Sequence, residues 1–417
     1  MKILVVGGGS GGHITPAVAV VRELLKIKPR ARVEFWTDWK YYKNVVKLTT
    51  EIGVGWGESE RKQGRTGQYI RVRKVLSGKF HRYANWEFKD YFRHFDTTLR
   101  ELIWGNLVGF LGFLGGVGQS FWRLLRKAER PEVIFLKGGF VCLPVGLMAR
   151  LFKIPYVIHE SDVVARLANR VLMKKATRVA FGMPLEEEVL EKHKNYEWVG
   201  IPVAEEFRPV TAAKQRSLKK AFGFDEEQPL VVVTGGSQGS AAMNRAMREI
   251  LEEVLKISSV GLVAGRKLYE EMVDLKRYEA WDKAKLTSNF RMWEFNTAMN
   301  ELMGAADVVV SRAGATTIAE LAALKKAVIL VPFERLPGGH QVKNAEKLRQ
   351  EGAVMVVENV KMEEDAGVLL EAIRKVLRSP KSRETMAENL YKGVRRDAAK
   401  RLAEILIEVD DERKKQK

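Results

Sequence analysis

The sequence predicts an α/β protein with two domains, each built on a parallel sheet with crossover helices. Short β-branched and aliphatic runs alternate with helical segments along most of the chain, as in repeated strand–helix–strand units. Two glycine-rich loops, at residues 7–12 and 235–240, each follow an apolar run and precede a helical segment. The 417 residues are ample for two hydrophobic cores, and each half of the chain contains one of these loops.

The first half opens directly with an apolar strand. We expect strands at 2–6, 33–37, 133–136 and 156–159, and helices at 15–26 and from Gly138-Gly139 to Leu151. Residues 56–78 are polar, basic and glycine-bearing, which predicts a loop. Residues 104–122 form an apolar, aromatic segment.

The second half repeats this architecture after a linker. Residues 200–203 and 209–220 are predicted to connect the halves, and strands are expected at 230–234, 260–264, 290–294, 307–311 and 327–332. The tail from Lys381 is helical and strongly charged. We therefore predict an N-terminal domain at 1–205, a C-terminal domain at 206–390, and a charged helix at 391–417 that packs back towards the N-terminal domain.

The charge balance predicts an anionic partner. The formal net charge is +19, which favours binding to nucleic acid, a phosphorylated substrate or an acidic membrane surface. Cys142 is the only cysteine, so an internal disulfide and a cysteine-rich metal site are excluded, and a cytosolic protein is expected. The sequence shows no signal peptide and no run of roughly 18 uninterrupted apolar residues.

The first glycine-rich loop is compatible with two kinds of site. Gly7-x-Gly9-x-x-Gly12 matches the dinucleotide fingerprint, and Asp38 follows near a second expected strand. His13, directly after the last glycine, favours a different chemistry, because an imidazole there can act as a general base. The alternative is a histidine that only hydrogen-bonds the loop.

The second half offers three ligand-binding segments. The loop at 235–240 lacks the lysine of an NTPase phosphate loop but suits a diphosphate bound by backbone N–H groups. Residues 311–320 place two threonines at a helix N-terminus, with Glu320 about one turn later to accept ribose hydroxyls. Residues 332–345 combine glycines and polar amides after a strand, which suits sugar hydroxyls. Each segment alone could be an ordinary turn or capped helix, but together they indicate a sugar-nucleotide enzyme.

The ordered set of blocks resembles the MurG family of peptidoglycan glycosyltransferases. The resemblance runs from Lys2 to about Ala353 and is dense at GGGSGGHITPAVAV, IPYVIHES, GGSQGSAAMN, MNELMGAADVVVSRAGATTIAEL and VPFERLPGGHQVKNA. It implies the two-domain GT-B fold and transfer of N-acetylglucosamine from its UDP donor to the 4-hydroxyl of lipid I, with inversion. It also implies peripheral attachment to the cytoplasmic face of the membrane.

The resemblance also implies roles for individual residues. The catalytic candidates are His13, Glu160 and Asp162, and the acceptor-binding candidates are Ser10, His13, Phe140 and Glu160. The donor-binding candidates are Ser10, Gly11, Gly12, Asp162, Gly236, Ser237, Gln238, Phe295, Asn296, Ala315, Thr316, Thr317, Ile318, Ala319, Glu320, His340 and Gln341. No metal site is indicated and no cofactor is expected to be required, although a divalent cation remains compatible with the chemistry.

Several positions depart from the family pattern. Ser161-Asp162 replaces the usual Gln-Asn, Ile201 and Ala204 replace an Asn and an Arg, and Phe140 replaces a tyrosine. These changes leave donor and acceptor choice open. They also suggest that Asp162 could raise the basicity of His13 as a carboxylate partner.

A membrane patch is expected because lipid I is anchored in a bilayer. The candidate residues combine aromatic and cationic side chains: Trp104, Phe110, Phe113, Trp122, Arg123 and Arg126. Burial of these aromatics in the core is the alternative. No nucleic-acid motif is present, although aromatic and basic residues interleave at 80–95, so an anionic membrane is the expected partner and nucleic acid is not.

Three other functions compete with lipid II synthesis. They are a GT-B transferase for another UDP-sugar or lipid-linked acceptor, a non-catalytic membrane or partner-binding protein, and a dinucleotide oxidoreductase.

Overall fold

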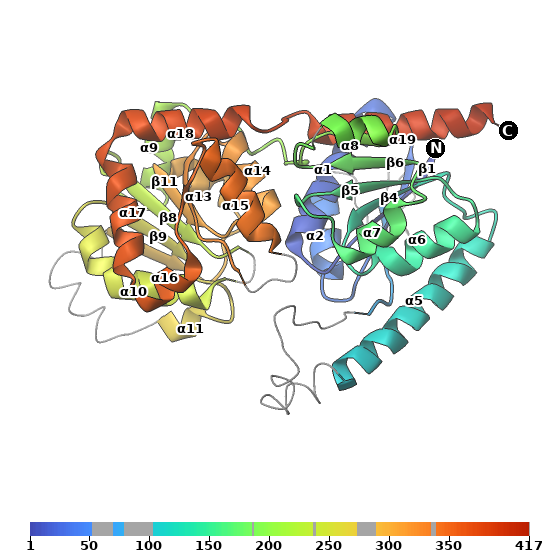
Figure 1. The fold of residues 1–417 in the computed structure, drawn as a ribbon, viewed down its shortest axis with the longest axis horizontal. Helices are drawn as coiled ribbons and strands as arrows, with labels where there is room; N and C mark the ends of the chain where they lie inside the picture. Colours follow the sequence, from blue (N-terminus) through green and yellow to red (C-terminus); the bar gives the residue numbers. More distant parts are fainter. Residues whose placement is uncertain are drawn as a thin grey trace, which may run out of the picture. The chain divides into compact units, whose positions relative to one another are not determined.

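The fold consists of two α/β units (Figure 1). The computed structural model describes residues 1–51, 70–78, 103–185, 187–236, 239–272, 289–334 and 339–416. The N-terminal unit comprises Met1–Ala204 and Arg395–Lys417, and the C-terminal unit comprises Glu205–Val394. Residues 391–394 therefore belong to the C-terminal unit, whereas the sequence analysis assigned them to the tail helix.

The N-terminal unit contains a seven-stranded parallel sheet in the order β3-β2-β1-β4-β5-β6-β7. Its strands are β1 (Lys2–Gly7), β2 (Arg32–Thr37), β3 (Ile70–Lys74), β4 (Val133–Gly138), β5 (Tyr156–Glu160), β6 (Arg178–Phe181) and β7 (Tyr196–Trp198). Its helices are α1 (Gly11–Ile27), α2 (Tyr42–Glu51), α5 (Asn106–Leu125), α6 (Cys142–Leu151), α7 (Leu167–Met173), α8 (Glu187–Lys192) and α19 (Ala398–Lys415).

Alternating side chains build a core on each face of this sheet. Ile3 and Val5 of β1 pack with α1 and α19, whereas Leu4 and Val6 pack in a second cluster with α5, α6 and α7. Both faces are covered, so the strands read as continuous apolar runs, as is usual for parallel sheets.

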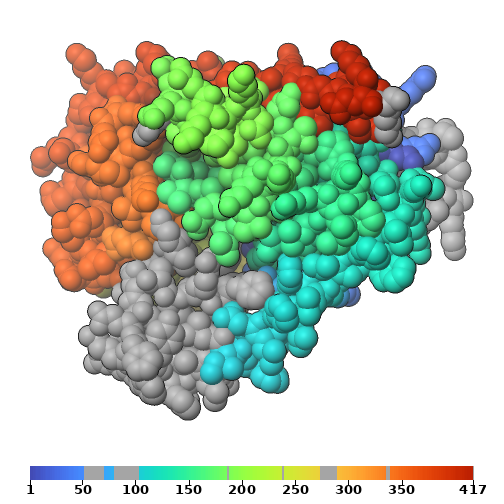
Figure 2. All heavy atoms as spheres, turned by 45° about the vertical axis from the view of Figure 1, so that its right-hand side comes forward, coloured from blue at the N-terminus to red at the C-terminus, as the bar shows by residue number. Residues whose placement is uncertain are grey.

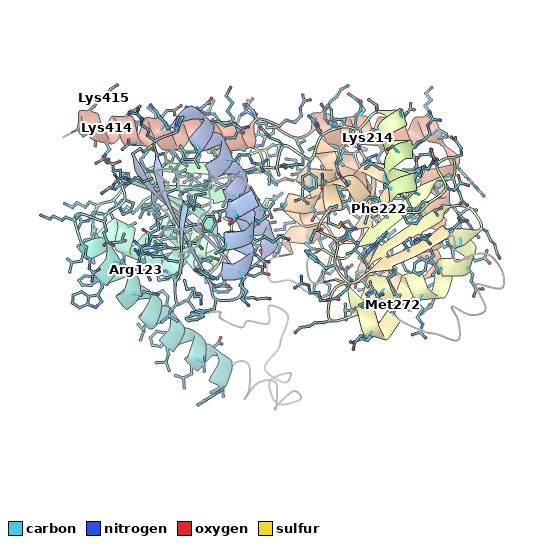
Figure 3. The ribbon with its side chains drawn as sticks, turned by 180° about the vertical axis from the view of Figure 1, so that it is seen from behind. Arg123, Lys214, Phe222, Met272, Lys414 and Lys415 are labelled. Atoms are coloured by element: carbon cyan, nitrogen blue, oxygen red, sulfur yellow. The ribbon has the colours of Figure 1, made fainter. Side chains whose placement is uncertain are left out.

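The last helix completes the first of these cores. Leu402, Leu406 and Val409 of α19 are buried in the cluster that contains β1 and α1. Arg401 donates from Nε and Nη2 to the Glu197 carboxylate at 2.6 and 3.0 Å. Figure 3 shows α19 from behind, with Lys414 and Lys415 near its end.

The C-terminal unit contains a six-stranded parallel sheet in the order β10-β9-β8-β11-β12-β13. Its strands are β8 (Leu230–Thr234), β9 (Ser259–Val263), β10 (Phe290–Trp293), β11 (Val308–Ser311), β12 (Ala327–Leu330) and β13 (Met355–Val356). Its helices are α9 (Ala212–Ala221), α10 (Ala241–Leu255), α11 (Tyr269–Met272), α13 (Met299–Ala305), α14 (Ala315–Ala323), α15 (His340–Gln350), α16 (Asn359–Glu364), α17 (Gly367–Arg378) and α18 (Pro380–Lys392).

Three local predictions were wrong. Most of the expected linker at 209–220 is α9, which Thr211 caps by accepting from Lys214 N at 3.2 Å (Figure 3). The expected loop at 56–78 contains the edge strand β3, which was not predicted because its sequence is rich in basic residues. Residues 56–69 lie outside the described residues. Helix α1 begins at Gly11 rather than at residue 15, because the helix starts within the glycine-rich loop.

Candidate functional site

The candidate site in the N-terminal unit lies where the carboxyl ends of β1, β4 and β5 meet. The loop after β1 is fixed by Asp38, whose carboxylate accepts from Gly9 N at 2.6 Å and Tyr41 N at 3.0 Å. Asp38 is buried, and its oxygens bind the loop itself. The acidic residue that a dinucleotide site would require is therefore engaged in building the turn.

His13 lies in the first turn of α1 and is only 7% exposed. Its ring packs against Gly138 and Gly139, which have φ angles of +127° and +89°. A Cβ on Gly138 would come within 2.9 Å of His13 Nδ1, and one on Gly139 within 2.2 Å of the Gly8 carbonyl oxygen. This close approach explains why β4 ends in one glycine and is followed by another.

The two ring nitrogens of His13 have different surroundings. Among the described residues, Nδ1 has no hydrogen-bond partner. Arg166 Nη1 donates to Nε2 at 3.3 Å. Because a guanidinium can only donate, Nε2 acts as the acceptor, which is the form of nitrogen that a general base requires.

Burial lowers the pKa of His13 well below its usual value, and the charges of Arg166, Lys137 and His159 lower it further. The expectation that Asp162 raises this pKa was wrong, because Asp162 Oδ2 accepts from Arg166 Nε at 2.8 Å. His13 is therefore neutral at pH 7 and able to accept a proton.

Glu160 organises the loop between β5 and α7. Its buried carboxylate accepts from Asp162 N at 3.1 Å, Arg166 N at 3.0 Å and Asn169 Nδ2 at 2.8 Å. These bonds hold the loop that presents Asp162 and Arg166 to His13. Glu160 thus lies beside the site, where its oxygens hold the protein backbone and Asn169.

The sequence analysis missed two cations of this site, Lys137 and Arg166. Lys137 Nζ donates to Ser161 Oγ at 2.6 Å, and burial lowers the pKa of Lys137 to about 8 although Glu160 and Asp162 raise it. No motif marks Lys137 as a site residue, because in the sequence it directly follows an apolar run that predicts a strand. The four-residue spacing of Asp162 and Arg166 could have indicated their ion pair.

The remaining N-terminal candidates lie around the same loop. Ser10 is the N-cap residue of α1, but its side chain makes no capping hydrogen bond. Gly11 and Gly12 form the first turn of α1. The ring of Phe140 packs over Gly9, where a Cβ would come within 2.9 Å of Phe140 Cε1. The structure thus brings together the acceptor-binding candidates of this unit.

In the C-terminal unit, the loop after β8 supplies Ser240, which caps the N-terminus of α10. Ser240 Oγ accepts from Met243 N at 3.4 Å and also lies 2.6 Å from Arg312 Nη2. Arg312 Nη1 donates to Val331 O at 3.0 Å and to Asn359 Oδ1 at 2.7 Å. Arg312 thereby ties this loop to the segment after β12. Gly236, with a φ of +81°, lies in the loop, while Ser237 and Gln238 lie outside the described residues.

Helix α14 begins differently, because Gly314 at its N-cap has no side chain. Thr316 and Thr317 lie in its first turn and are half-buried. Ala315, Ile318 and Ala319 are buried, so their side chains face the core and only their backbone could meet a ligand. Half-buried Glu320 follows, and burial raises the pKa of its carboxyl group to about 8.

The other donor candidates lie on two further segments of this unit. Gln341 Oε1 accepts from Phe333 N at 2.9 Å, which holds the segment after β12. His340 begins α15 after Gly339, which has a φ of +58°. Asn296 Oδ1 accepts from Ala298 N at 2.7 Å, and the exposed ring of Phe295 lies 4.8 Å from the Arg266 guanidinium.

The residues that were predicted to contact a membrane lie on α5 and on the turns directly before and after it. Trp104 and Trp122 are 65% and 66% exposed, and the neighbouring exposed apolar residues are Ile103, Leu107, Val108, Phe110, Leu111, Leu114 and Leu125. Figure 2 shows α5 in cyan at the surface of the N-terminal unit. Phe113 is only half-buried, and Arg126 is exposed. In the part of the chain that the structure describes, no helix has the length and apolar character that crossing a bilayer needs.

The glycines of α5 have a packing role. A Cβ on Gly116 would come within 2.1 Å of the Leu76 carbonyl oxygen, and one on Gly112 within 2.9 Å of the Ser77 carbonyl oxygen. The segment after β3 therefore crosses α5 at backbone distance along a glycine strip. Apolar residues on the rest of the helix stay exposed.

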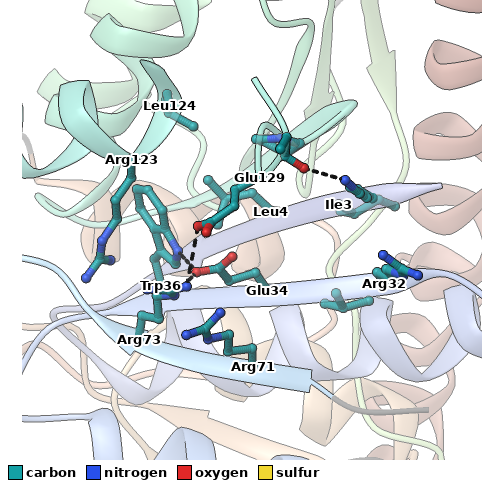
Figure 4. A pocket seen from close by; sticks show the side chains of 14 residues that line it. Ile3, Leu4, Arg32, Glu34, Trp36, Arg71, Arg73, Arg123, Leu124 and Glu129 are labelled. Carbon is teal, nitrogen blue, oxygen red and sulfur yellow. Dashed lines mark hydrogen bonds and ion pairs between the residues drawn. The ribbon is translucent and has the colours of Figure 1, made fainter. Parts of the chain in front are cut away.

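Arg123 faces away from the exposed apolar residues. Its guanidinium lies 4.9 Å from the Trp36 ring, and burial with the charges of Arg73 and Arg71 lowers its pKa. It lines a cavity of about 210 Å³ whose other lining residues come mostly from β1, β2 and β3 (Figure 4). Glu34 and Glu129 pair with Arg73 in the same cavity. His13 is not among the residues that line this cavity.

Two parallel-sheet Rossmann-like units, each with a glycine-rich loop after its first strand, have the architecture of the GT-B fold. Models of the glycosyltransferase family 28 N-terminal and C-terminal domains match residues 3–181 and 230–402. The chain belongs to glycosyltransferase family 28.

Relatives match over nearly the whole chain. A Thermoanaerobacter sp. (strain X514) protein is 30% identical over 411 residues, covering 97% of this chain and 99% of its own. A Clostridium perfringens (strain 13 / Type A) protein is 32% identical over 375 residues, or 89% of each. Both are named UDP-N-acetylglucosamine--N-acetylmuramyl-(pentapeptide) pyrophosphoryl-undecaprenol N-acetylglucosamine transferase.

Solved structures share the fold. The crystal structure of Acinetobacter baumannii MurG has a TM-score of 0.64 at 20% identity and covers 98% of this chain and 99% of its own. The calicheamicin glycosyltransferase CalG4 has a TM-score of 0.61 at 13% identity, with 98% of each chain covered. The predicted fold class is therefore confirmed.

Proposed function

We propose that this chain transfers N-acetylglucosamine from UDP-N-acetylglucosamine to the 4-hydroxyl of lipid I, giving lipid II for peptidoglycan synthesis. Its family and its near full-length relatives support this activity. The observation that carries the chemistry is His13, a neutral imidazole at the start of α1 with Nε2 as an acceptor. A base of this kind contributes about 10²- to 10⁴-fold to a rate.

The reaction is a single displacement. His13 Nε2 takes the proton of the acceptor 4-hydroxyl, and that oxygen forms a bond to the anomeric carbon of the donor sugar. The bond between this carbon and the UDP oxygen breaks on the opposite face, and its electron pair leaves with the diphosphate. Attack from the opposite face inverts the anomeric configuration.

The C-terminal unit would bind the donor. The N-terminus of α14 lacks a capping side chain at Gly314, so its backbone N–H groups and threonine hydroxyls suit the diphosphate. Glu320 suits the ribose hydroxyls, exposed Phe295 suits the uracil ring, and Gln341 with His340 suits the sugar. Charge neutralisation by a helix end needs no resident metal, and turnover in EDTA tests this expectation.

The N-terminal unit would dock on the membrane through α5. Its exposed tryptophans and Phe110 suit the interfacial region of a bilayer, with Arg126 beside them. In vesicle co-sedimentation, Trp104→Ser with Trp122→Ser should lower binding to phosphatidylglycerol vesicles at least tenfold. The matched control is Trp36→Phe, because Trp36 is buried under Arg123. Equal binding by the double variant and the wild type would contradict this role.

A related transferase activity is the second candidate. Asp162 is one of the departures from the family pattern, and its carboxylate pairs with Arg166 on the acceptor side of the site, which motivates another UDP-sugar or lipid acceptor. The test is turnover of UDP-N-acetylglucosamine, UDP-N-acetylgalactosamine and UDP-glucose on a lipid I analogue. A preference for the first sugar supports the main proposal, and a preference for another supports the second. If the wild type turned over none of the three donor sugars, and so behaved in this assay as His13→Ala does, the result would support a non-catalytic protein.

A further inference from the structure

Arg166 is fixed at its backbone but reaches His13 with a half-exposed side chain. Its backbone N donates to buried Glu160 at 3.0 Å directly before α7 begins. The side chain is 44% exposed, and Nε donates to Asp162 Oδ2 at 2.8 Å. The backbone and Nε are thus anchored, while the far end of the guanidinium lies against His13.

The contact with His13 occupies the nitrogen that catalysis needs. Nη1 donates to Nε2 at 3.3 Å, so the lone pair that would take the acceptor proton already accepts a hydrogen bond. The other ring nitrogen lies against Gly138 and has no hydrogen-bond partner among the described residues. In this arrangement His13 has the correct tautomer for a base, but Arg166 covers it.

A phosphate would compete strongly for Arg166. A guanidinium bound to an uncharged imidazole at 3.3 Å makes a long hydrogen bond to a neutral acceptor. Two parallel bonds to phosphate oxygens are charge-assisted and roughly twice as strong each. Because the guanidinium is a rigid plane, it would move as a whole, through the torsions of its aliphatic stem, to exchange one partner for the other.

We propose that Arg166 covers the base in the empty enzyme and moves to the diphosphate of the lipid acceptor, which frees His13 Nε2 only when acceptor is present. This inference rests on the proposed function, because it takes the acceptor to be a lipid diphosphate. Arg166 is thus a positioning residue that links acceptor binding to activation of the base. It also prevents proton transfer to His13 before the acceptor arrives.

The groups that face His13 define what the removal of Arg166 should do. Lys137 of β4 and His159 of β5 face it along with Arg166, and Glu160 and Asp162 lie beside Lys137. All three facing side chains oppose protonation of His13. Loss of Arg166 removes one of them and should raise the pH at which His13 protonates, while Lys137 and burial remain.

The first experiment is direct and needs no turnover. ¹⁵N-histidine-labelled full-length protein is titrated with farnesyl diphosphate, and the His13 resonances are assigned by difference from His13→Gln. In the wild type we expect the Nε2 resonance to shift on addition, as the hydrogen bond from Arg166 is lost. In Arg166→Gln we expect no shift with farnesyl diphosphate and a midpoint of His13 titration at higher pH. A wild-type resonance that ignores saturating farnesyl diphosphate overturns the proposal.

The second experiment separates this role from a structural one. Arg166→Gln should raise the acceptor KM about tenfold or more, with kcat changed less than threefold and the acid limb of kcat/KM moved to higher pH. The matched control is Arg170→Gln, an exposed arginine one turn further along α7, which should behave as wild type. The proposal is overturned if Arg166→Gln and Arg170→Gln change the acceptor KM equally. It is also overturned if the acid limb of the pH profile of kcat/KM is the same in Arg166→Gln as in the wild type. Absence of wild-type turnover would instead refute the proposed function, while the resonance shift would still decide the role of Arg166.

Discussion

The two glycine-rich loops place a serine at the start of a helix in each unit, but the two helix ends differ. Ser240 caps α10 by accepting from Met243 N at 3.4 Å, whereas the side chain of Ser10 makes no capping bond to α1. The serine before α10 thus caps its own helix, whereas the serine before α1 does not. Similar sequence signals therefore give a capping serine in one unit and a serine that does not cap in the other.

The comparison extends to charge. Around His13 the N-terminal unit collects the side chains of Lys137, Arg166 and Asp162, whereas α14 of the C-terminal unit offers backbone and hydroxyl groups with one half-buried carboxyl, Glu320. We infer a division of labour in which the N-terminal unit moves the proton and the C-terminal unit receives the departing diphosphate.

The largest expected effect is on His13. His13→Ala should lower kcat by about 10²- to 10⁴-fold, because the general base is lost. The dissociation constant for UDP-N-acetylglucosamine, measured by calorimetry, should change less than threefold, since the donor is assigned to the other unit. If His13→Ala lost much of its donor affinity but kept its kcat, the result would contradict the proposed division between proton transfer in the N-terminal unit and donor binding in the C-terminal unit.

The start of α14 is the next most sensitive position. Gly314→Asp should weaken donor binding about tenfold or more, since a carboxylate there would bind the N–H groups and repel the diphosphate. The backbone at Gly314 suits any residue, with φ −72° and ψ 130°, so stability should stay equal or rise by a few tenths of a kcal/mol. Gly314→Asn is the control, because its side chain also caps the helix but carries no charge. It separates repulsion of the diphosphate from competition for the backbone N–H groups. Unchanged donor affinity in Gly314→Asp would place the diphosphate elsewhere.

The pKa of Glu320 predicts pH-dependent donor binding. Its carboxyl group has a pKa of about 8, raised from 4.5 by burial, so the ionised form that accepts two ribose hydroxyls gains population as pH rises towards 8. The donor dissociation constant should fall roughly tenfold between pH 6.5 and 8.5, and this slope should vanish in Glu320→Gln. Calorimetry at these pH values checks both statements. An equal slope in wild type and variant would assign the titration to another group.

The smallest effect compares the two serines directly. Ser240→Ala should cost about 1–2 kcal/mol of unfolding free energy, because it removes a helix cap and a partner of Arg312. Ser10→Ala should cost less than about 0.5 kcal/mol, since no capping bond is lost. Urea denaturation of both variants measures the difference, and equal losses would show that the two helix ends are alike.

The sequence was sufficient for features that local pattern controls. Apolar runs that alternate with helical segments predicted most strands within one or two residues, and the glycine before His13 indicated the N-terminus of α1. The segment at 209–220 was mistaken for a linker, because α9 is mostly polar and buries only Leu218 and Lys219. Exposed helices of this kind carry little apolar periodicity.

The charges that surround His13 were beyond sequence reasoning. Arg166 lies 153 residues from His13, and Lys137 is 24 residues from Ser161, so only the order of β1, β4 and β5 in the sheet brings them together. Arg123 was grouped with the membrane cations by its position in the sequence. Its side chain instead reaches Trp36, because the helix turns that residue towards the sheet.

The return of α19 to the first unit affects how the protein forms during translation. Leu402, Leu406 and Val409 close a core whose other members were synthesised first. The Glu205–Val394 unit is a continuous stretch and can collapse once it leaves the ribosome, whereas the core of the first unit that α1 and α2 cover stays incomplete until α19 is made. A nascent chain stalled before residue 395 would expose the part of this core that α19 covers, which makes it a natural target for chaperones and proteases.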